Sequence, residues 1–405
     1  MKSQEVRRKE QKPAKISVDD VLRHAREVFG VVRTDQTHVD EFDSYDDRNF
    51  FLSKICFANE PDQYVDVVMK IHNGVESDNL PLVVAQNDVL SYLSLHAVDV
   101  PLPIKTADNT SCVGCIILPC ISGSDSRQHA VRLLQYIPGS IIGQREEESP
   151  ALLQDIGRYL EAGWLAYRCP VLDYEQPLSR RRPGLWARWI KSCLRCPKSL
   201  RELLRSSALV AEGAASALKE RDLLWDLKNV PSLSSFSEFI KDEGRRALQR
   251  EVIRRFEEKV SPKMESLRKA VIQNDANEQN ILIDQDRRRV QGIIDFGDCT
   301  YTCLIFELAI CMAYLMLGKK DILTTATHIY AGYNKEVSLT QDEKEILHCL
   351  ICSRLVQSLT LGAYSFSKDP TNEYLLVTAQ TGWVALEALM AIREDDFLKR
   401  MEEGV

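Results

Sequence analysis

The sequence predicts an α+β protein of two lobes, a small β-rich lobe followed by a larger, mainly helical one. Three observations support this prediction. Between residues 50 and 137, four segments are rich in aromatic and β-branched residues, as strands are. From Phe236 onward, nearly every segment carries apolar residues at helical spacing. The exception, residues 281–298, has two short apolar runs around a charged turn, which predicts a hairpin inside the helical lobe.

The small lobe is predicted over residues 17–137, after a disordered tail of residues 1–16. Ser17 precedes a run of apolar residues at helical spacing, so its side chain is expected to cap the first helix. The expected strands are 50–57, 64–71, 111–120 and 129–137, and the expected helix is 82–96. This lobe is therefore predicted to be a mostly antiparallel sheet with one helix inserted after its third strand.

The large lobe is predicted over residues 138–400, with residues 136–139 as the connector between lobes. Its expected helices are 151–167, 238–260, 303–317, 339–364 and 374–392. Residues 168–219 depart from this pattern because they are strongly basic in a chain that is acidic elsewhere. We interpret residues 168–219 as a solvated or poorly ordered insertion within the lobe. The alternative is a basic, tryptophan-bearing helix that lies on a membrane surface or an acidic partner.

The overall composition excludes several classes of function. With 52 Lys and Arg against 59 Asp and Glu, the net charge of −7 does not attract polyanions, so no nucleic-acid partner is predicted. The most apolar run, residues 303–317, is too short to cross a bilayer, so no transmembrane segment is predicted. The polar, basic start predicts a cytoplasmic protein. No pattern predicts an oligomeric state.

The residues that indicate chemistry lie on either side of the predicted hairpin. Asn280 follows Asp275 by five residues, and Asp295 comes directly after the second strand. Antiparallel strands of one hairpin can bring these side chains to the same end of the lobe. Phosphoryl transfer needs a carboxylate that accepts the proton of the attacking hydroxyl, and oxygen ligands that hold Mg²⁺ against the phosphates. The spacing therefore predicts Asp275 as the catalytic base and Asn280 and Asp295 as Mg²⁺ ligands, unless they merely form turns and caps.

A phosphate clamp is predicted in the small lobe. Lys70 lies near the end of an apolar strand, where a lysine can reach the α- and β-phosphates of a nucleotide. The alternative is an exposed lysine on an edge strand. The following helix carries Gln86 where an acidic partner for Lys70 would be expected, and its side chain could hydrogen-bond the ammonium group.

Two further segments are candidates for nucleotide contacts. The turn between two expected strands includes Ser44 and Asn49, whose polar groups would cover the phosphates in place of a glycine-rich loop. An ordinary hairpin turn is the alternative. Backbone groups around Gln135 to Ile137, at the entry to the connector, are expected to face the purine.

Together these motifs resemble those of the aminoglycoside phosphotransferase and choline kinase family, and within it the hydroxylysine kinases. The segments that carry the resemblance are 44–50, 68–73, 131–139, 223–231, 274–283, 292–298, 306–310, 353–359 and 378–383. The resemblance implies a two-lobed, protein-kinase-like fold. It also implies transfer of the γ-phosphate of a nucleotide, GTP or ATP, with Mg²⁺, to the hydroxyl of a small molecule. In the hydroxylysine kinases the nucleotide is GTP and the acceptor is 5-hydroxylysine.

The chain departs from the family pattern beside its catalytic residue. Gln273 and Asn274 stand where the family commonly has His-Gly before the aspartate. A pseudokinase that binds nucleotide and acts as a scaffold is therefore one alternative. A kinase for another amino alcohol, such as choline or ethanolamine, is a second.

Three more residues are candidates for substrate binding or support. Asp298 follows the Asp295 motif and is expected to support the catalytic loop or to contact the substrate. A cationic amino acid would bind near acids and aromatic rings, which makes Glu278 and Trp225 candidates as well.

Overall fold

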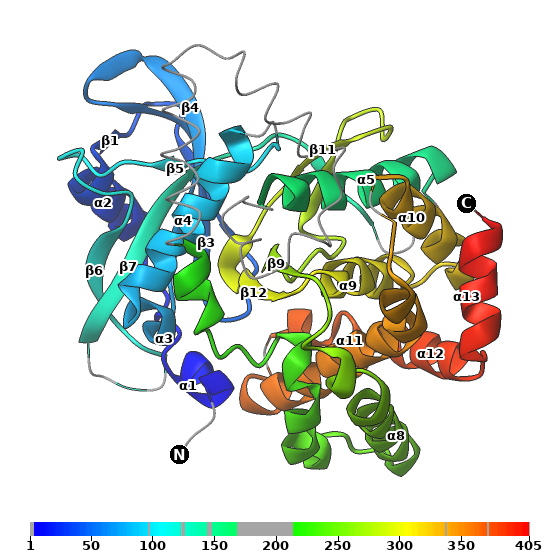
Figure 1. The fold of residues 1–405 in the computed structure, drawn as a ribbon. Helices are drawn as coiled ribbons and strands as arrows, with labels where there is room; N and C mark the ends of the chain where they lie inside the picture. Colours follow the sequence, from blue (N-terminus) through cyan, green and yellow to red (C-terminus); the bar gives the residue numbers. More distant parts are fainter. Residues whose placement is uncertain are drawn as a thin grey trace.

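A computed structural model gives the fold of the chain. It describes residues 4–95, 98–121, 123, 126–143, 148–167, 214–336, 338–370 and 372–404. Figure 1 shows two lobes, with the blue and cyan strands on one side and the green to red helices on the other. The predicted α+β, two-lobed fold class is confirmed.

The small lobe is built on a seven-stranded antiparallel sheet. Its strands are β1 (Val31–Val32), β2 (His38–Phe42), β3 (Arg48–Phe57), β4 (Glu60–Ile71), β5 (Pro103–Ile104), β6 (Gly114–Pro119) and β7 (Ser126–Gln135). The order is β1-β3-β4-β7-β5, with β2 paired to β3 and β6 paired to β7. In this register Lys70 of β4 lies opposite Asn49 of β3 and Arg132 of β7. A charged side chain is thereby placed near the end of a central strand.

Helices flank this sheet. Helix α2 (Val18–Phe29) begins at Ser17, whose Oγ accepts a hydrogen bond from the Asp20 backbone at 3.2 Å, as predicted. It packs with the sheet in a core of its own that includes Leu52 and Met69. Two more helices, α3 (Gly74–Ser77) and α4 (Leu80–Leu95), follow β4. Most of the buried apolar residues of α4 belong to the larger core, so this helix links the two lobes.

The predicted disordered tail over residues 1–16 is wrong for the part that the structure describes. Residues Gln4–Glu10 form helix α1, and Arg8 and Lys9 in it are buried. Arg8 forms ion pairs with Asp46 and Glu76, which lie far along the chain. The basic residues that suggested a solvated tail are therefore neutralised by distant acids, and a local pattern does not reveal such pairs.

The large lobe is mainly helical. Its helices are α5 (Pro150–Tyr167), η3 (Leu227–Phe239), α8 (Glu243–Lys259), η4 (Ser261–Lys263), α9 (Ile305–Leu315), α10 (Ile322–Glu336), α11 (Gln341–Lys368), η6 (Glu373–Leu376), α12 (Ala379–Met390) and α13 (Glu394–Glu403). Its strands are β8 (Ser140–Ile141), β9 (Lys269–Ile272), β10 (Ile281–Ile283), β11 (Val290–Ile293) and β12 (Thr300–Cys303). The predicted hairpin is β10–β11, which pairs antiparallel and is extended by β8. Strands β9 and β12 pair beside it.

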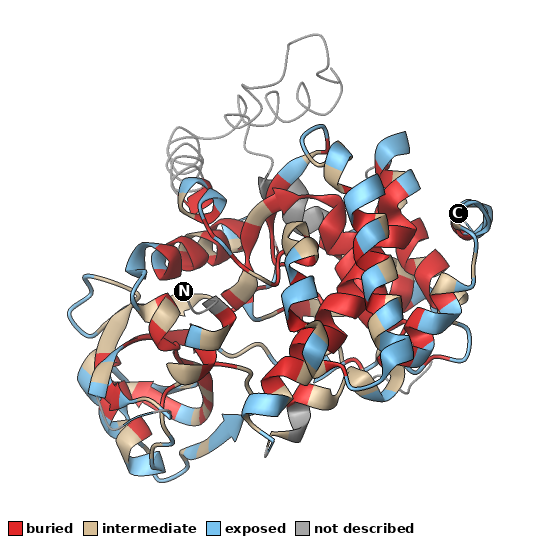
Figure 2. Cartoon of the chain, turned by 90° about the horizontal axis from the view of Figure 1, so that it is seen from below, coloured by how far each residue is buried: buried red, intermediate tan, exposed pale blue. Residues whose placement is uncertain are grey.

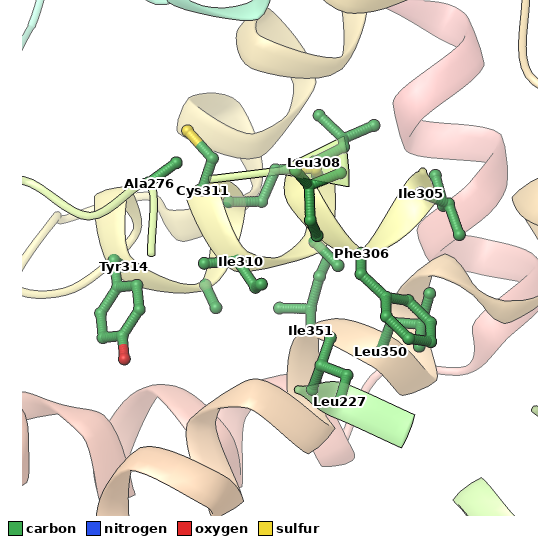
Figure 3. Close-up of a cluster of buried hydrophobic side chains, with 14 of the residues drawn as sticks. Leu227, Ala276, Ile305, Phe306, Leu308, Ile310, Cys311, Tyr314, Leu350 and Ile351 are labelled. Carbon is green, nitrogen blue, oxygen red and sulfur yellow. The ribbon is translucent and has the colours of Figure 1, made fainter. Parts of the chain in front are cut away.

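Helices α9 and α11 form the centre of the large lobe. All residues of α9 are buried, and Figure 2 shows red, buried segments running through the helical lobe. Figure 3 shows Phe306 and Ile310 of α9 beside Leu350 and Ile351 of α11. By length and composition α11 could cross a membrane, but 94% of its apolar stretch is buried inside the protein. Its apolar character is therefore accounted for by the core.

The predicted basic insertion, 168–219, falls mostly outside the described residues. Its described part begins at Ala214, which is buried in the larger core together with Ala215 and Leu218. These last few residues therefore belong to the folded lobe, because their apolar side chains pack against the main core.

Candidate active site

A cleft of about 720 Å³ lies between the two lobes. The predicted site residues that line it are Ser44, Asn49, Lys70, Gln135, Ile137, Trp225, Asp275, Glu278, Asn280, Asp295 and Asp298. These residues come from the small-lobe sheet and the turn before β3, the connector, the segment before η3, the loop before β10 and the segment after β11. Gln86 is the one predicted residue that does not line the cleft.

The loop between β9 and β10 is held by Gln273. Its Oε1 accepts a hydrogen bond from the Asp275 backbone at 2.7 Å. Its Nε2 donates to the carbonyls of Ile294, at 3.0 Å, and Asp295, at 2.7 Å. One amide thus uses both its acceptor and its donor to connect the Asp275 loop to the Asp295 segment. The glutamine can therefore support the loop where the family commonly has an imidazole.

Asn274 adopts the left-handed conformation, with φ of 67°. Glycine and, among other residues, asparagine tolerate this region best, so asparagine can replace the glycine of the family pattern. The Asn274 backbone N–H donates to Glu307 Oε2 at 2.9 Å. Its side chain donates to the Trp225 carbonyl at 3.3 Å. The strained residue is therefore fixed on both sides.

Asp275 receives hydrogen bonds from three side chains. Arg354 Nη2 lies 3.0 Å from Oδ1, while Asn277 Nδ2, at 3.0 Å, and Asn280 Nδ2, at 2.8 Å, both donate to Oδ2. Burial raises the pKa of Asp275 to about 7, although the Arg354 guanidinium acts to lower it. About a quarter of the side chain, 27%, is exposed, so the carboxylate is accessible from the cleft. A carboxyl with a pKa near neutrality is suited to accept and release a proton.

The sequence reasoning did not identify Arg354 as a site residue. It lies in α11, within one of the segments that carry the family resemblance, but 79 residues separate it from Asp275. Arg354 also donates hydrogen bonds to the Trp225 carbonyl and to Gln357 Oε1, and its guanidinium lies over the rings of Trp225 and Tyr314. No local spacing rule connects a helix in the core to this loop, so only the packed structure reveals the pair.

Lys70 and Asp295 form an ion pair across the cleft. Lys70 Nζ lies 3.0 Å from Asp295 Oδ1 and 3.1 Å from Asp47 Oδ2. Burial alone would lower the pKa of Lys70, but these two carboxylates raise it above its usual value. Burial would likewise raise the pKa of Asp295, but Lys70 more than offsets this and lowers it. Both groups are therefore charged at neutral pH.

We expected Gln86, in the helix that follows, to hydrogen-bond Lys70, and this prediction is wrong. Gln86 is fully buried and donates to the Gly297 carbonyl at 3.0 Å. The acidic partner is Asp47, which directly precedes β3, the strand that pairs with the Lys70 strand β4. The register that places Asn49 opposite Lys70 also brings Asp47 near it. Cross-strand pairing of the predicted strands is the signal that could have indicated this residue.

Asp298 pairs with arginines, whereas we expected it to support the loop or contact substrate. Its Oδ1 lies 3.5 Å from Nη2 of Arg8 and 3.9 Å from Nη2 of Arg221. Burial raises its pKa, while these two guanidinium groups oppose the rise. No hydrogen bond joins it to the described catalytic loop. Its side chain remains 20% exposed at the edge of the cleft.

Aromatic and acidic side chains are among the residues that line the cleft. Tyr45 and Trp225 meet edge to face, with ring centroids 5.6 Å apart. Tyr314, Glu278 and Ser358 also line the cleft. Aromatic faces and carboxylates are groups that bind ammonium ions, so this region suits a cationic small molecule.

Oxygen ligands for a metal ion are available beside the Lys70–Asp295 pair. Asp295 is 42% exposed, and Lys70 and the Gly297 backbone contact only its Oδ1, which leaves Oδ2 for a cation. Asn280 uses Nδ2 for its contacts with Asp275, so Oδ1 is its available ligand atom. A carboxylate and an amide oxygen suit hard Mg²⁺.

A second cluster, Asp47, His72 and Glu76, has the geometry of a possible metal site, since its ligand atoms lie within 4.8 Å of one another. However, Arg132 Nε donates to His72 Nε2 at 2.9 Å. His72 Nδ1 must then carry the proton that it donates to Glu76 at 2.8 Å. Both ring nitrogens of His72 are therefore used in hydrogen bonds and are not free to bind a metal. We interpret the cluster as a hydrogen-bond network.

The buried acid that holds the loop leads to a prediction about stability. Burial raises the pKa of Glu307 to about 8, far above the value of a carboxyl in an unfolded chain. The folded state then binds more protons between about pH 4.5 and 8, so stability falls as pH rises through this range. Glu307→Gln keeps an acceptor for Asn274 and does not ionise. We expect it to match the wild type near pH 5 and to be more stable, by a few kcal/mol, at pH 9.

Urea unfolding at several pH values measures this difference. Glu265→Gln, the same change at an exposed position, serves as control and should show no pH-dependent gain. A constant difference between Glu307→Gln and wild type across the pH range would contradict the raised pKa.

Comparisons with known proteins agree with this geometry. The phosphotransferase enzyme family matches residues 43–333. Hydroxylysine kinase of Mus musculus is 30% identical over 355 residues, which cover 85% of this chain and 82% of the mouse protein. Hydroxylysine kinase of Xenopus laevis is 30% identical over 388 residues, covering 93% and 90%. The solved structure of a microcompartment-associated aminopropanol kinase has a similar fold, with a TM-score of 0.58 and 13% identity over 95% of this chain and 100% of that one.

Proposed function

Because the chain belongs to the phosphotransferase enzyme family, and is therefore a kinase with a hydroxyl acceptor, we propose that it phosphorylates the side-chain hydroxyl of 5-hydroxylysine, with GTP preferred to ATP. The observation that carries the proposal is the arrangement of Asp275 in one cleft with the Lys70–Asp295 pair. It supplies a proton acceptor and a phosphate-binding cation in a single site.

Most of the predicted residues have a role in this proposal. Asp275 orients the acceptor hydroxyl and accepts its proton, and Arg354 fixes the carboxylate. Lys70 binds the α- and β-phosphates. Asn280 and Asp295 would hold Mg²⁺, which neutralises phosphate charge when bound. Ser44, Asn49 and the backbone at 135–137 would contact the nucleotide, and the small lobe, 17–137, is thus the nucleotide-binding unit.

The acceptor is chosen from the named relatives, and the site is compatible with it. Glu278 and Trp225 are both buried residues that line the cleft, so an ammonium group would find a carboxylate and an aromatic face in the same site. The preference for GTP rests on the resemblance alone. A cytoplasmic location is also part of the proposal, and the nine described cysteines support it because all are free thiols.

A substrate screen tests the proposal. We expect release of nucleoside diphosphate with 5-hydroxylysine, and at least about a hundred-fold lower kcat/KM with choline or ethanolamine. Choline and ethanolamine lack the carboxylate of an amino acid, so a site built for an amino acid would leave the groups that bind this carboxylate unpaired. Lysine, which lacks only the hydroxyl, is the matched control and should not be phosphorylated. GTP and ATP are compared under the same conditions.

The outcomes separate the parts of the proposal. Equal turnover of ethanolamine or choline would refute the hydroxylysine assignment and leave the kinase. Faster reaction with ATP would refute only the nucleotide preference. Nucleotide binding without turnover of any amino alcohol would favour the pseudokinase, against which the intact contacts of Gln273 and Asn274 now argue.

A further inference from the structure

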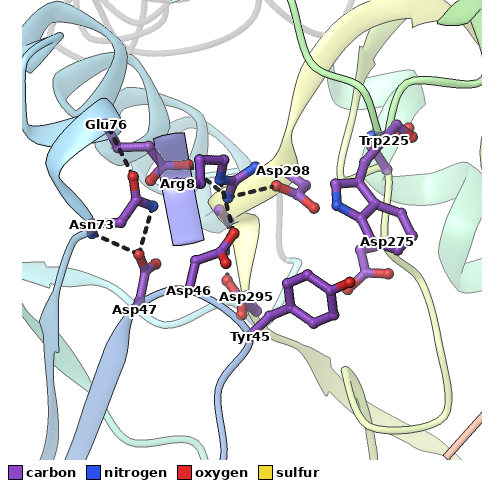
Figure 4. Close-up of polar contacts among 12 residues, drawn as sticks. Arg8, Tyr45, Asp46, Asp47, Asn73, Glu76, Trp225, Asp275, Asp295 and Asp298 are labelled. Atoms are coloured by element: carbon purple, nitrogen blue, oxygen red, sulfur yellow. Dashed lines mark hydrogen bonds and ion pairs between the residues drawn. The ribbon is translucent and has the colours of Figure 1, made fainter. Parts of the chain in front are cut away.

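Helix α1 lies before the family domain, which begins at residue 43, and yet it contributes to the cleft. Arg8 is one of the residues that line the cleft, and its side chain is 9% exposed. Figure 4 shows Arg8 at the centre of a group of acids, Asp46, Glu76 and Asp298. A segment outside the matched domain therefore extends to the nucleotide side of the site.

The guanidinium of Arg8 connects three separate parts of the chain. Its Nε lies 3.0 Å from Asp46 Oδ2, in the turn before β3. Its Nη2 lies 3.2 Å from Glu76 Oε1, in α3, and 3.5 Å from Asp298 Oδ1, after β11. One side chain thus bridges the turn expected to cover the phosphates and the segment that carries Asp295.

Other residues near α1 hold the same turn. Lys9 Nζ lies 2.7 Å from Asp46 Oδ1 and donates to the Tyr45 carbonyl at 3.1 Å. Lys12 Nζ donates to the Ser44 carbonyl at 2.9 Å. On the opposite side, the Tyr45 hydroxyl donates to the Leu361 carbonyl of α11 at 3.1 Å. The turn is therefore fixed by α1 and by the large lobe together.

Electrostatics give Arg8 a role beyond holding the turn. Asp46 is buried, and Asp298 lies at the cleft edge beside Asp295. Arg8, together with Lys9 at Asp46 and Arg221 at Glu76 and Asp298, reduces the repulsion among these carboxylates and between them and an approaching triphosphate. Loss of Arg8 would leave these buried acids with fewer cationic partners, which is costly.

We propose that Arg8 is a positioning residue for nucleotide binding: it holds the turn at residues 44–47 over the phosphates and neutralises the acids beside them. This inference rests on the proposed function only in requiring that a nucleotide binds in the cleft. It assigns a part of the site to the chain outside the family domain.

The test measures binding of a non-hydrolysable Mg²⁺–GTP or Mg²⁺–ATP analogue to the full chain by calorimetry. We expect Arg8→Ala to weaken binding at least about tenfold. The matched control is Arg7→Ala, which removes the same charge from the exposed neighbouring position and should stay within about twofold. Thermal unfolding is recorded for each variant, and binding is compared well below every melting temperature.

A double-mutant cycle separates positioning from a purely structural role. If Arg8 acts through Asp46, then Asp46→Asn alone also weakens binding, and adding it to Arg8→Ala causes no further loss. Arg8→Lys keeps the charge but not the fork that contacts several acids, so it should be intermediate. Unchanged affinity in a folded Arg8→Ala protein, even with a lower melting temperature, would overturn the inference. Absence of nucleotide binding by the wild type would instead refute the proposed function, and the inference with it.

Discussion

Asp275→Asn is expected to lower kcat by about 10²- to 10⁴-fold and to leave the affinity for Mg²⁺–nucleotide within about threefold of the wild type. The carboxylate is the proposed proton acceptor and contacts Asn277, Asn280 and Arg354. An amide at this position cannot take up the proton of the acceptor hydroxyl. Since the proposed phosphate contacts lie at Lys70 and Asp295, binding of the nucleotide should be nearly unaffected.

Two further variants make this result decisive. Asp286→Asn makes the same chemical change in the exposed turn between β10 and β11, and should retain full activity. In Asp275→Asn the new NH₂ group faces the donors that now bind Oδ2, so Asp275→Ala should be measured as well, with melting temperatures for both. Retention of most of the wild-type kcat by folded variants would show that another group accepts the proton.

Asp295→Asn is expected to weaken nucleotide binding, which Asp275→Asn should leave nearly unchanged. Loss of this carboxylate removes both the proposed metal ligand and the 3.0 Å partner of Lys70. Changes around a metal site commonly cost 10- to 100-fold in affinity, so we expect Mg²⁺–nucleotide binding to weaken by about 100-fold or more. The measurement is a calorimetric titration with the nucleotide analogue over a range of Mg²⁺ concentrations.

The magnesium titration also separates the two possible causes. If Asp295 binds the metal, a high Mg²⁺ concentration should restore part of the lost affinity. If Asp295 only pairs with Lys70, added Mg²⁺ should not rescue the variant. Asp286→Asn again serves as the control, and nucleotide binding equal to that of wild type in Asp295→Asn would exclude the metal role.

Several features of the fold followed from local patterns in the sequence. Alternating and periodic apolar residues predicted the sheet, the helices and the β10–β11 hairpin, because burying one face of an element requires such periodicity. The spacing of Asp275, Asn280 and Asp295 predicted that these residues would share one site, since a single hairpin connects them. Their roles in catalysis stay predictions until the variants are measured.

Contacts between distant segments were not predictable in this way. Arg354 reaches Asp275 from the core helix α11, and Arg8 meets Asp46 from a segment predicted to be disordered. An ion pair depends on where two charges lie in space, and neither member carries a periodic signal along the chain.

The sequence by itself determined the two lobes, the family and the residues proposed for phosphoryl transfer, because hydrophobic period and short motifs are local properties. Only the tertiary structure decided which charged groups hold those residues in place. In the tertiary structure Gln86 hydrogen-bonds Gly297, Asp47 pairs with Lys70, and Arg8 of α1 lines the cleft. The physical reason is that buried charges must be compensated wherever packing brings them together, and packing is a property of the whole chain.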